Sequence, residues 1–460
     1  MKRCVSVAAL AVMVSLASFA QSKQKIFHLA IGDPERRTRD ARVVLDGITD
    51  TDKGEVFSVN QLAARLDGTR LLLLGEEHTT ADFHRVQLRV IRALHDAGRK
   101  VTIGLEMFSY TEQRSLDNWR DGLLTETGFL TLARWYEFWG YHWDYYRDIF
   151  LYARDNRIPM YGVNTPRSVV TAVRQKGIEH LSDAERQHVP PQIDVDNADH
   201  LAFFRASFED DDSMHGHMPE SMLKSMQAAQ ATWDASMGYN SVKVLKAAPP
   251  DSILVVLVGS GHVAYGVGIE HQARQWFEGK ITTLIPVPVE DSEEKPVESV
   301  KASYANFVWG IPYERDSLYP SLGFSTETAG ARKIIAIEKD SIAARSGFQV
   351  NDQVLSLDGI AAPDRETWNR LMATKNWGDS VVVTVKRGDA EVKINCGTPP
   401  EAEGTALTAQ IHAGAAGQWH HWLLGAFPAA SSAPVRGRCA VKSRGFWATH
   451  LQGSTPAACL

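Results

Sequence analysis

The sequence predicts a layered α/β domain with a mostly parallel mixed sheet and a helical insertion, followed by a small β-rich domain. Two observations carry this expectation. Short apolar runs alternate with longer segments of helical periodicity over most of the chain, whereas closely spaced strand and hairpin signals fill the part after residue 318. The 460 residues, 44% hydrophobic and 23% charged, have the composition of a folded globular protein.

Residues 1–20 have the pattern of an export signal. Lys2 and Arg3 precede an apolar stretch over residues 4–19, and Ser18-Phe19-Ala20 matches a small-x-small cleavage site. The stretch is shorter than the roughly 20 residues that a membrane span needs. We therefore expect an exported protein, in the periplasm or cell envelope, with an uncleaved anchor as the alternative.

Charge and cysteine usage exclude several classes of site. The 49 basic and 55 acidic residues give a net charge of −6, which argues against a nucleic-acid partner. Cysteine occurs only at Cys4, Cys396, Cys439 and Cys459. Residues 5–395 therefore offer no disulfide framework, thiolate zinc site or cysteine nucleophile. Metal chemistry there must use His, carboxylate, Tyr or Met side chains.

The predicted first domain covers residues 25–310. Its apolar runs, which we interpret as strands buried on both faces, are residues 71–75, 101–106, 159–163, 253–258 and 281–287. Helical patterns between them include residues 83–97, 143–156 and 220–237. The long stretch between Pro166 and Ser252 is expected to be a helical insertion.

The predicted second domain covers residues 318–395 and follows a charged connector over residues 288–317. Its strand signals are residues 333–338, 353–358 and 380–387, with turns at Asp358-Gly359 and Gly388-Asp389. A helix is expected over residues 365–373. Residues 400–460 are rich in alanine and show no sustained period, so we expect a disordered tail.

Polar side chains of the first domain follow four of its predicted strands. In an open α/β sheet, ligands bind outside the carboxyl ends of the strands. The side chains that could ligate a divalent cation there through oxygen or imidazole nitrogen are Glu77, His78, Glu106 and His262. Asn164 and Arg167 are expected at the edge of the same site. The alternative is that each histidine only caps a strand end, but two Gly-x-x-His elements with two glutamates favour a functional site.

Five segments in this region stand in a recognisable order. They are Gly-Glu-Glu-His-Thr-Thr (75–80), Gly-Leu-Glu-Met-Phe (104–108), Gly-Val-Asn-Thr-Pro-Arg (162–167), Ala-Gln-Ala-Thr-Trp-Asp-Ala-Ser-Met (229–237) and Gly-Ser-Gly-His-Val-Ala-Tyr-Gly-Val-Gly-Ile (259–269). Together they resemble the ChaN-like haem-binding proteins of bacteria, from the superfamily that also holds the Tiki proteins. The resemblance spans about residues 50–290.

This resemblance implies an exported protein that binds haem and acts in haem or iron acquisition, with haem as the cofactor. A haem or iron source is then the expected partner, and a homodimer is among the assemblies that the resemblance implies. One feature departs from the family. ChaN-like proteins are often lipoproteins, whereas Cys4 lies before the apolar stretch and no lipidation cysteine follows it, so membrane association stays open.

The same superfamily implies a second function. Tiki proteins are metal-dependent proteases, and their paired Gly-x-x-His motifs with a glutamate match His78, His262 and Glu106. A divalent metal would activate a water molecule, and a glutamate that does not ligate it, Glu77 or Glu106, would act as the base. We therefore expect a haem-binding protein, with a metal-dependent hydrolase or peptidase as the alternative, and catalysis is left open.

Haem needs an axial ligand and apolar walls, and the resemblance associates ligation with tyrosine. Residues 135–152 hold ten aromatic side chains, which can wall a porphyrin or pack in the core. The candidate ligands are Tyr265, Tyr136 and Tyr141, together with His215 and His217 in a methionine-rich stretch. Met218, Met222 and Met226 follow helical spacing, so core packing is the stronger interpretation of that stretch.

Residues 318–395 resemble a bacterial PDZ domain. The resemblance rests on Ser321-Leu322-Gly323-Phe324 and on the segments at 334–337, 340–348 and 350–359. It implies that a peptide or a protein C-terminus adds as a strand beside residues 323–325, with Leu322, Gly323, Phe324 and Trp368 in contact with it. The alternatives are a small barrel that docks within the protein, and a non-catalytic scaffold in which this domain alone is active.

Overall fold

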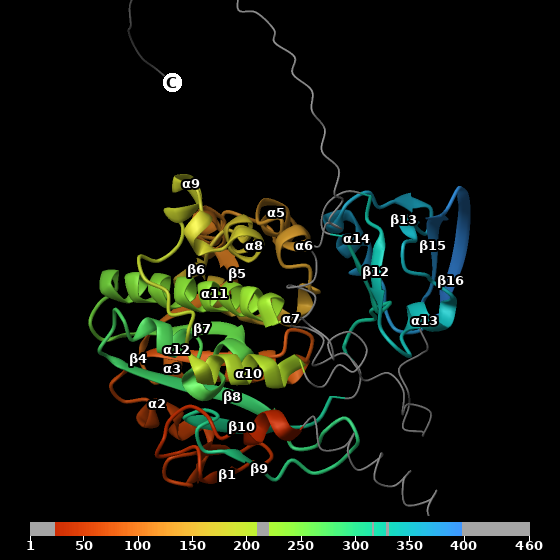
Figure 1. The fold of residues 1–460 in the computed structure, drawn as a ribbon. Helices are drawn as coiled ribbons and strands as arrows, with labels where there is room; N and C mark the ends of the chain where they lie inside the picture. The colour runs from red at the N-terminus through yellow and green to blue at the C-terminus, as the bar shows by residue number, and fades with distance from the viewer. Residues whose placement is uncertain (1–23, 209–219, 315–316, 328–330, 398–460) are drawn as a thin grey trace, which may run out of the picture. The chain divides into compact units, whose positions relative to one another are not determined.

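The computed structural model describes residues 24–208, 220–314, 317–327 and 331–397 (Figure 1). The predicted export signal and the predicted tail at 400–460 lie outside the described residues, as do His215, His217 and Met218. Among the described residues, none of the helices has the length and apolar character needed to cross a bilayer.

The first domain is built on an eight-stranded mixed sheet. In spatial order its strands are β3 (Val56–Phe57), β2 (Ile48–Asp50), β10 (Phe307–Ile311), β8 (Lys280–Pro288), β4 (Thr69–Glu76), β7 (Ser252–Gly259), β5 (Lys100–Ser109) and β6 (Met160–Asn164). The neighbours from β10 to β6 are parallel, and β2 and β3 add an antiparallel edge. The mostly parallel mixed sheet and its five predicted strands are confirmed.

The predicted connector over residues 288–317 is wrong in one respect. Strand β10 lies within it, is buried at every position and pairs in parallel with β8. A second short strand, β9 (Ser299–Lys301), pairs with β1 (Asp40–Arg42) near the start of the chain. The acidic residues at 290–294 hid these strands, because they occupy only the turn between β8 and β9.

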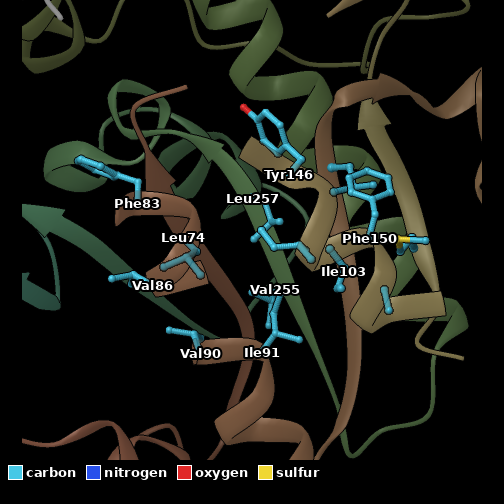
Figure 2. Packing of buried hydrophobic residues seen from close by; sticks show 14 of the residues in the cluster. Leu74, Phe83, Val86, Val90, Ile91, Ile103, Tyr146, Phe150, Val255 and Leu257 are labelled. Carbon is cyan, nitrogen blue, oxygen red and sulfur yellow. The ribbon is translucent and has the colours of Figure 1, made fainter. Parts of the chain in front are cut away.

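Alternate side chains of the central strand enter two separate hydrophobic cores. Leu72 and Leu74 of β4 belong to the core under α3 (Ala81–Asp96) and α7 (Asp144–Asp155), which Figure 2 shows. Leu71 and Leu73 belong to the core under α11 (Glu220–Ala247) and α12 (Ile269–Ala273). Because strand side chains alternate between the faces, helices on both sides require an apolar residue at every position.

The predicted helical insertion is present. It contains α8 (Arg167–Lys176), α9 (Asp183–Arg186), α10 (Ala198–Phe208) and the long helix α11. Helix α11 runs ten residues beyond the predicted end at residue 237. Met226 and Met237 are both buried on it, which agrees with packing rather than ligation for the described methionines of this stretch.

The second domain has the predicted β-rich architecture. Strands β11 (Phe324–Thr326) and β12 (Ile334–Ile337) form one sheet, and β14 (Ile360–Ala361), β13 (Gln353–Leu357), β15 (Ser380–Arg387) and β16 (Ala390–Gly397) form another. Helices α13 (Ile342–Ser346) and α14 (Arg365–Met372) complete the domain. Asp358 and Gly359 both have positive φ, as the predicted tight hairpin turn requires.

Candidate functional site

The carboxyl ends of four adjacent strands, β4, β7, β5 and β6, form the site edge. His78 follows β4 and His262 follows β7, and the two rings flank Gly259, the last residue of β7. A Cβ atom at Gly259 would lie 3.4 Å from Cε1 of His78 and 3.6 Å from Cδ2 of His262. Both imidazole rings therefore lie within van der Waals distance of the position that a Cβ atom of residue 259 would take.

The first imidazole is held by a buried carboxylate. Nδ1 of His78 lies 2.7 Å from Oε1 of Glu76, which also accepts a hydrogen bond of 2.6 Å from the hydroxyl of Tyr146. The amide of Gln87 donates to the other oxygen of Glu76, and His84 lies 3.7 Å from it. Burial alone would raise the pKa of Glu76, but the nearby histidines and Tyr146 outweigh it and lower the pKa to about 2.

Glu76 is the carboxylate that contacts His78, and Glu77, predicted as a metal ligand or base, lies beside it in the sequence. Successive side chains of a strand point in opposite directions, so the side chains of Glu76 and Glu77 diverge at the end of β4. The carboxylate of Glu77 instead accepts a hydrogen bond of 3.1 Å from the hydroxyl of Thr80. Both glutamates still line the cavity at this edge.

The second imidazole is held between two carboxylates. Nδ1 of His262 lies 2.6 Å from Oδ1 of Asp234 on helix α11, and its Nε2 lies 3.4 Å from Oε1 of Glu106. The other oxygen of Glu106 accepts a hydrogen bond of 2.7 Å from the amide of Gly259. Burial would lower the pKa of His262, but Asp234 and Glu106 outweigh it and raise the pKa to about 10.

Two carboxylate–imidazole pairs thus meet around Glu106. Burial would lower the pKa of His78, but Glu76 and Glu106 raise it, and the histidines lower the pKa of Glu106 in return. Each Nδ1 contacts a carboxylate, and Nε2 of His262 lies beside Glu106, so the site can hold or move a proton between imidazole and carboxylate. Within the described ranges, no cluster of three or more His, Cys, Asp and Glu side chains has an arrangement suited to a metal ion.

Aromatic side chains form a wall beside the first pair. The ring of His78 lies 4.7 Å from the ring of Trp139 and 5.0 Å from that of Tyr141, measured between centroids. The aromatic residues of this domain that line the cavity are Phe27, Phe138, Trp139, Tyr141, Tyr145, Phe203, Trp233 and Tyr304. The members of segment 135–152 that belong to the hydrophobic core are Trp135, Trp139, Trp143, Tyr145, Tyr146 and Phe150. The segment therefore serves both as core and as cavity wall.

The structure separates the tyrosines proposed as haem ligands. The hydroxyl of Tyr265 donates to the carbonyl of Ile26 at 2.6 Å and accepts from the amide of Leu29 at 3.0 Å. Tyr265 thus secures the N-terminal segment, and Tyr136 packs against the core. Of these tyrosines, Tyr141 alone is among the described residues that line the cavity.

Asn164 and Arg167, the two residues predicted at the site edge, both line the cavity. Asn164 donates through its side-chain amide to the carbonyl of Glu106 at 3.0 Å, and so ties the end of β6 to β5. Arg167 begins helix α8, lines the cavity, and donates to the carbonyl of Phe138 at 3.2 Å. Burial lowers the pKa of Arg167 to about 9, which leaves a cation at neutral pH.

Three residues of the site were not predicted from the sequence: Glu76, Tyr146 and Asp234. Asp234 lies in the segment at 229–237, one of the five segments that carry the family resemblance, and Glu76 stands directly before the predicted Glu77. For Asp234 and Glu76, membership of a segment shared with the family was the signal that could have identified them as site residues. Nothing local in the sequence places Asp234 behind a histidine that follows it by 28 residues.

The loop before β11 requires a glycine at position 323. Gly323 has φ +75°, and a Cβ atom there would lie 2.3 Å from Cβ of Ser341, so only glycine fits. Leu322 is buried, and the ring of Phe324 lies 5.4 Å from that of Trp368 on α14. Among the described strands, β11 pairs with β12.

Comparison with known proteins agrees with this architecture. Residues 62–272 match the family model described as haem-binding uptake, Tiki superfamily, ChaN, and residues 320–397 match the model of the PDZ domain. The chain is 26% identical over 211 residues to Protein RETICULATA-RELATED 5, chloroplastic, of Arabidopsis thaliana. That match covers 44% of this chain and only 28% of the plant protein.

Among solved structures, the chain matches one described as cofacial heme binding to ChaN of Campylobacter jejuni. It is 19% identical with a TM-score of 0.44, and the match covers 57% of this chain and 95% of that one. An HtrA-type protease, AlgW, with a decapeptide is 19% identical with a TM-score of 0.17, over 18% of this chain and 30% of the protease. Residues 62–272 are thus a domain of the ChaN haem-binding uptake family in the Tiki superfamily, and residues 320–397 are a PDZ domain.

Proposed function

We propose that the first domain binds haem in the cavity at the carboxyl ends of its strands, with Tyr141 as the axial ligand. The observation that carries this proposal is the aromatic wall of that cavity, in which Tyr141 and Trp139 lie against the ring of His78. Tyrosine oxygen is a known ligand of haem iron. The family match at residues 62–272 supports haem as the bound molecule.

Other side chains that line the cavity suit the propionates and the porphyrin plane of haem. Arg167 brings a partly buried guanidinium to the cavity, where it can pair with a propionate. The phenyl and indole faces of Phe138 and Trp139 offer apolar surface to a porphyrin plane. The donor set of the cavity therefore fits haem, although His262 is already committed to two carboxylates.

A hemin titration of the full chain tests the proposal. Saturable binding with a shifted Soret band is expected for the wild type and for Tyr136→Phe, whose ring packs against the core. Tyr141→Phe should bind at least about tenfold more weakly and lose the spectroscopic signature of phenolate ligation. Absence of saturable binding would exclude haem, and equal binding by both variants would exclude Tyr141 as the ligand.

A second function is favoured by a different observation. The two carboxylate–imidazole pairs around Glu106 are suited to acid–base chemistry, and would suit a metal-dependent hydrolase or peptidase if a metal displaces the proton of His262. Metal analysis and peptide hydrolysis, in the wild type and in His78→Ala/His262→Ala, test this function. Equal metal content and equal hydrolysis in the two proteins would exclude it.

The wider role of the chain is part of the same proposal. The basic and apolar pattern of residues 1–20 supports export to the periplasm or cell envelope. There the first domain would act in haem or iron acquisition, and the PDZ domain would hold the C-terminal peptide of a partner as a strand beside β11. Fractionation of cells that express the full chain tests the location.

A further inference from the structure

Arg332 of the PDZ domain has an unusual environment for a cation. It is only 6% exposed, and its guanidinium carbon lies 5.1 Å from the ring centroid of Trp368. Its Nη1 donates to the carbonyls of Ala362 at 2.9 Å and Asp364 at 3.3 Å. Stacking and two hydrogen bonds therefore fix the guanidinium in one orientation.

This fixed cation is not neutralised by an ion pair. Across the residues that the structure describes, no carboxylate forms a salt bridge with Arg332, and its Nε has no hydrogen-bond partner. Asp364, the acidic side chain whose charge acts on Arg332, is occupied as the cap of α14, where it accepts a hydrogen bond of 2.7 Å from the amide of Thr367. A buried cation without a paired anion is costly, so an incoming carboxylate would be favoured here.

The position of Arg332 relates it to the peptide groove. Both Arg332 and Trp368 line the cavity beside β11. In the β11–β12 pair, Thr326 lies opposite Ile334, and the amide of Glu327 donates to the carbonyl of Lys333 at 2.9 Å. Arg332 thus stands just beyond the far end of β11, at the opposite end of the strand from Gly323.

A bound peptide has a defined register in this groove. If its terminal carboxylate lies at Gly323, the peptide must run antiparallel to β11, with its last residue beside Phe324. Its second residue upstream then lies beside Thr326, and its fourth lies beyond the strand, near Arg332. Because side chains alternate along a strand, these two upstream positions share the face of the last residue.

We propose that this groove selects extended peptides with a free terminal carboxylate and an acidic side chain two or four residues before the last one, and that Arg332 determines this preference. The inference rests on the proposed peptide binding by the PDZ domain and names its substrate class. It assigns a role to a charged side chain that contributes nothing to a salt bridge among the described residues.

The test measures fluorescence anisotropy of the full chain with labelled heptapeptides that end in a free valine carboxylate. The peptides carry Glu or Gln at the second or the fourth position before the valine, and an amidated peptide reports non-specific binding. We expect a Glu peptide to bind about tenfold more tightly than its Gln counterpart, as for a partly buried charge-assisted pair. In Arg332→Met, which keeps apolar contact with Trp368, the Gln peptide should bind as before and the Glu preference should disappear.

Each outcome decides between defined alternatives. Equal affinity of Glu and Gln peptides for the wild type, or a Glu preference that survives in Arg332→Met, would overturn the inference and leave peptide binding intact. Binding of no peptide, or equal binding of the amidated one, would overturn the peptide-binding function as well. If Arg332→Met binds neither peptide, Arg332→Lys provides the second variant, because it keeps the charge and should retain part of the Glu preference.

Discussion

Glu76 offers the sharpest test of the site, because its neighbour Glu77 is a matched control. The substitution Glu76→Gln keeps the shape of the side chain and removes a buried charge that contacts His78, Tyr146 and Gln87. The pKa of Glu76 is lowered from 4.5 to about 2. At 1.36 kcal/mol per pKa unit, the ionised form contributes about 3 kcal/mol to the free energy of unfolding at pH 7.

The pH dependence follows from the direction of this shift. Because the folded pKa lies below the unfolded one, the contribution is complete above about pH 4.5 and is lost as the pH falls towards 2. Urea unfolding at pH 7 should therefore show Glu76→Gln less stable than the wild type by about 3 kcal/mol, and by only about 1 kcal/mol at pH 3.

Glu77→Gln changes a partly exposed carboxylate with a hydrogen bond from Thr80, so a loss below about 1 kcal/mol is expected at both pH values. Equal stability of Glu76→Gln and the wild type at pH 7 would refute the assignment of Glu76 as the buried anion. A larger loss in Glu77→Gln than in Glu76→Gln would refute it as well.

Two further predictions concern Asp234 and Gly323. Asp234→Asn removes one of the two carboxylates that raise the pKa of His262 to about 10. The pKa of His262 should then fall towards its ordinary range, as measured by NMR titration of the imidazole Cε1 proton. The charged ring contributes stability below its unfolded pKa and loses it as the pH rises towards 10, and this contribution should shrink in the variant. An unchanged His262 titration would contradict the pairing. Gly323→Ala places a Cβ atom 2.3 Å from Cβ of Ser341 at positive φ, so peptide binding measured by anisotropy should be lost while the hemin spectrum stays unchanged.

Local sequence patterns were sufficient for the sheet and for the edge that carries the site. Strands β4 and β7 are covered by helices on both faces, so they are apolar along almost their whole length and stand out as runs. Since parallel strands bring their carboxyl ends to one edge, His78 and His262 could be placed together from the sequence. Strand β10 was not found in the same way, because the acidic residues at 290–294 marked the whole segment 288–317 as a connector.

The partners of the two histidines were decided by the tertiary structure. Whether Glu76 or Glu77 contacts His78 depends on the residue at which strand β4 ends, and the sequence Glu-Glu-His does not reveal that residue. Asp234 reaches His262 only because α11 packs across the sheet beside β7. Tyr265 stands three residues from His262 in the sequence, yet its positive φ turns its hydroxyl to the N-terminal segment.

The sequence alone determined which chemical groups arrive at the strand ends, because buried strands appear as apolar runs and the residues that follow each run can be read directly. The tertiary structure decided which of those groups touch, because contact depends on strand pleat, on helix packing and on single backbone angles. The same division holds in the PDZ domain. Gly323 was predicted from its motif, whereas the unpaired, stacked guanidinium of Arg332 is visible only once β12 and α14 are folded together.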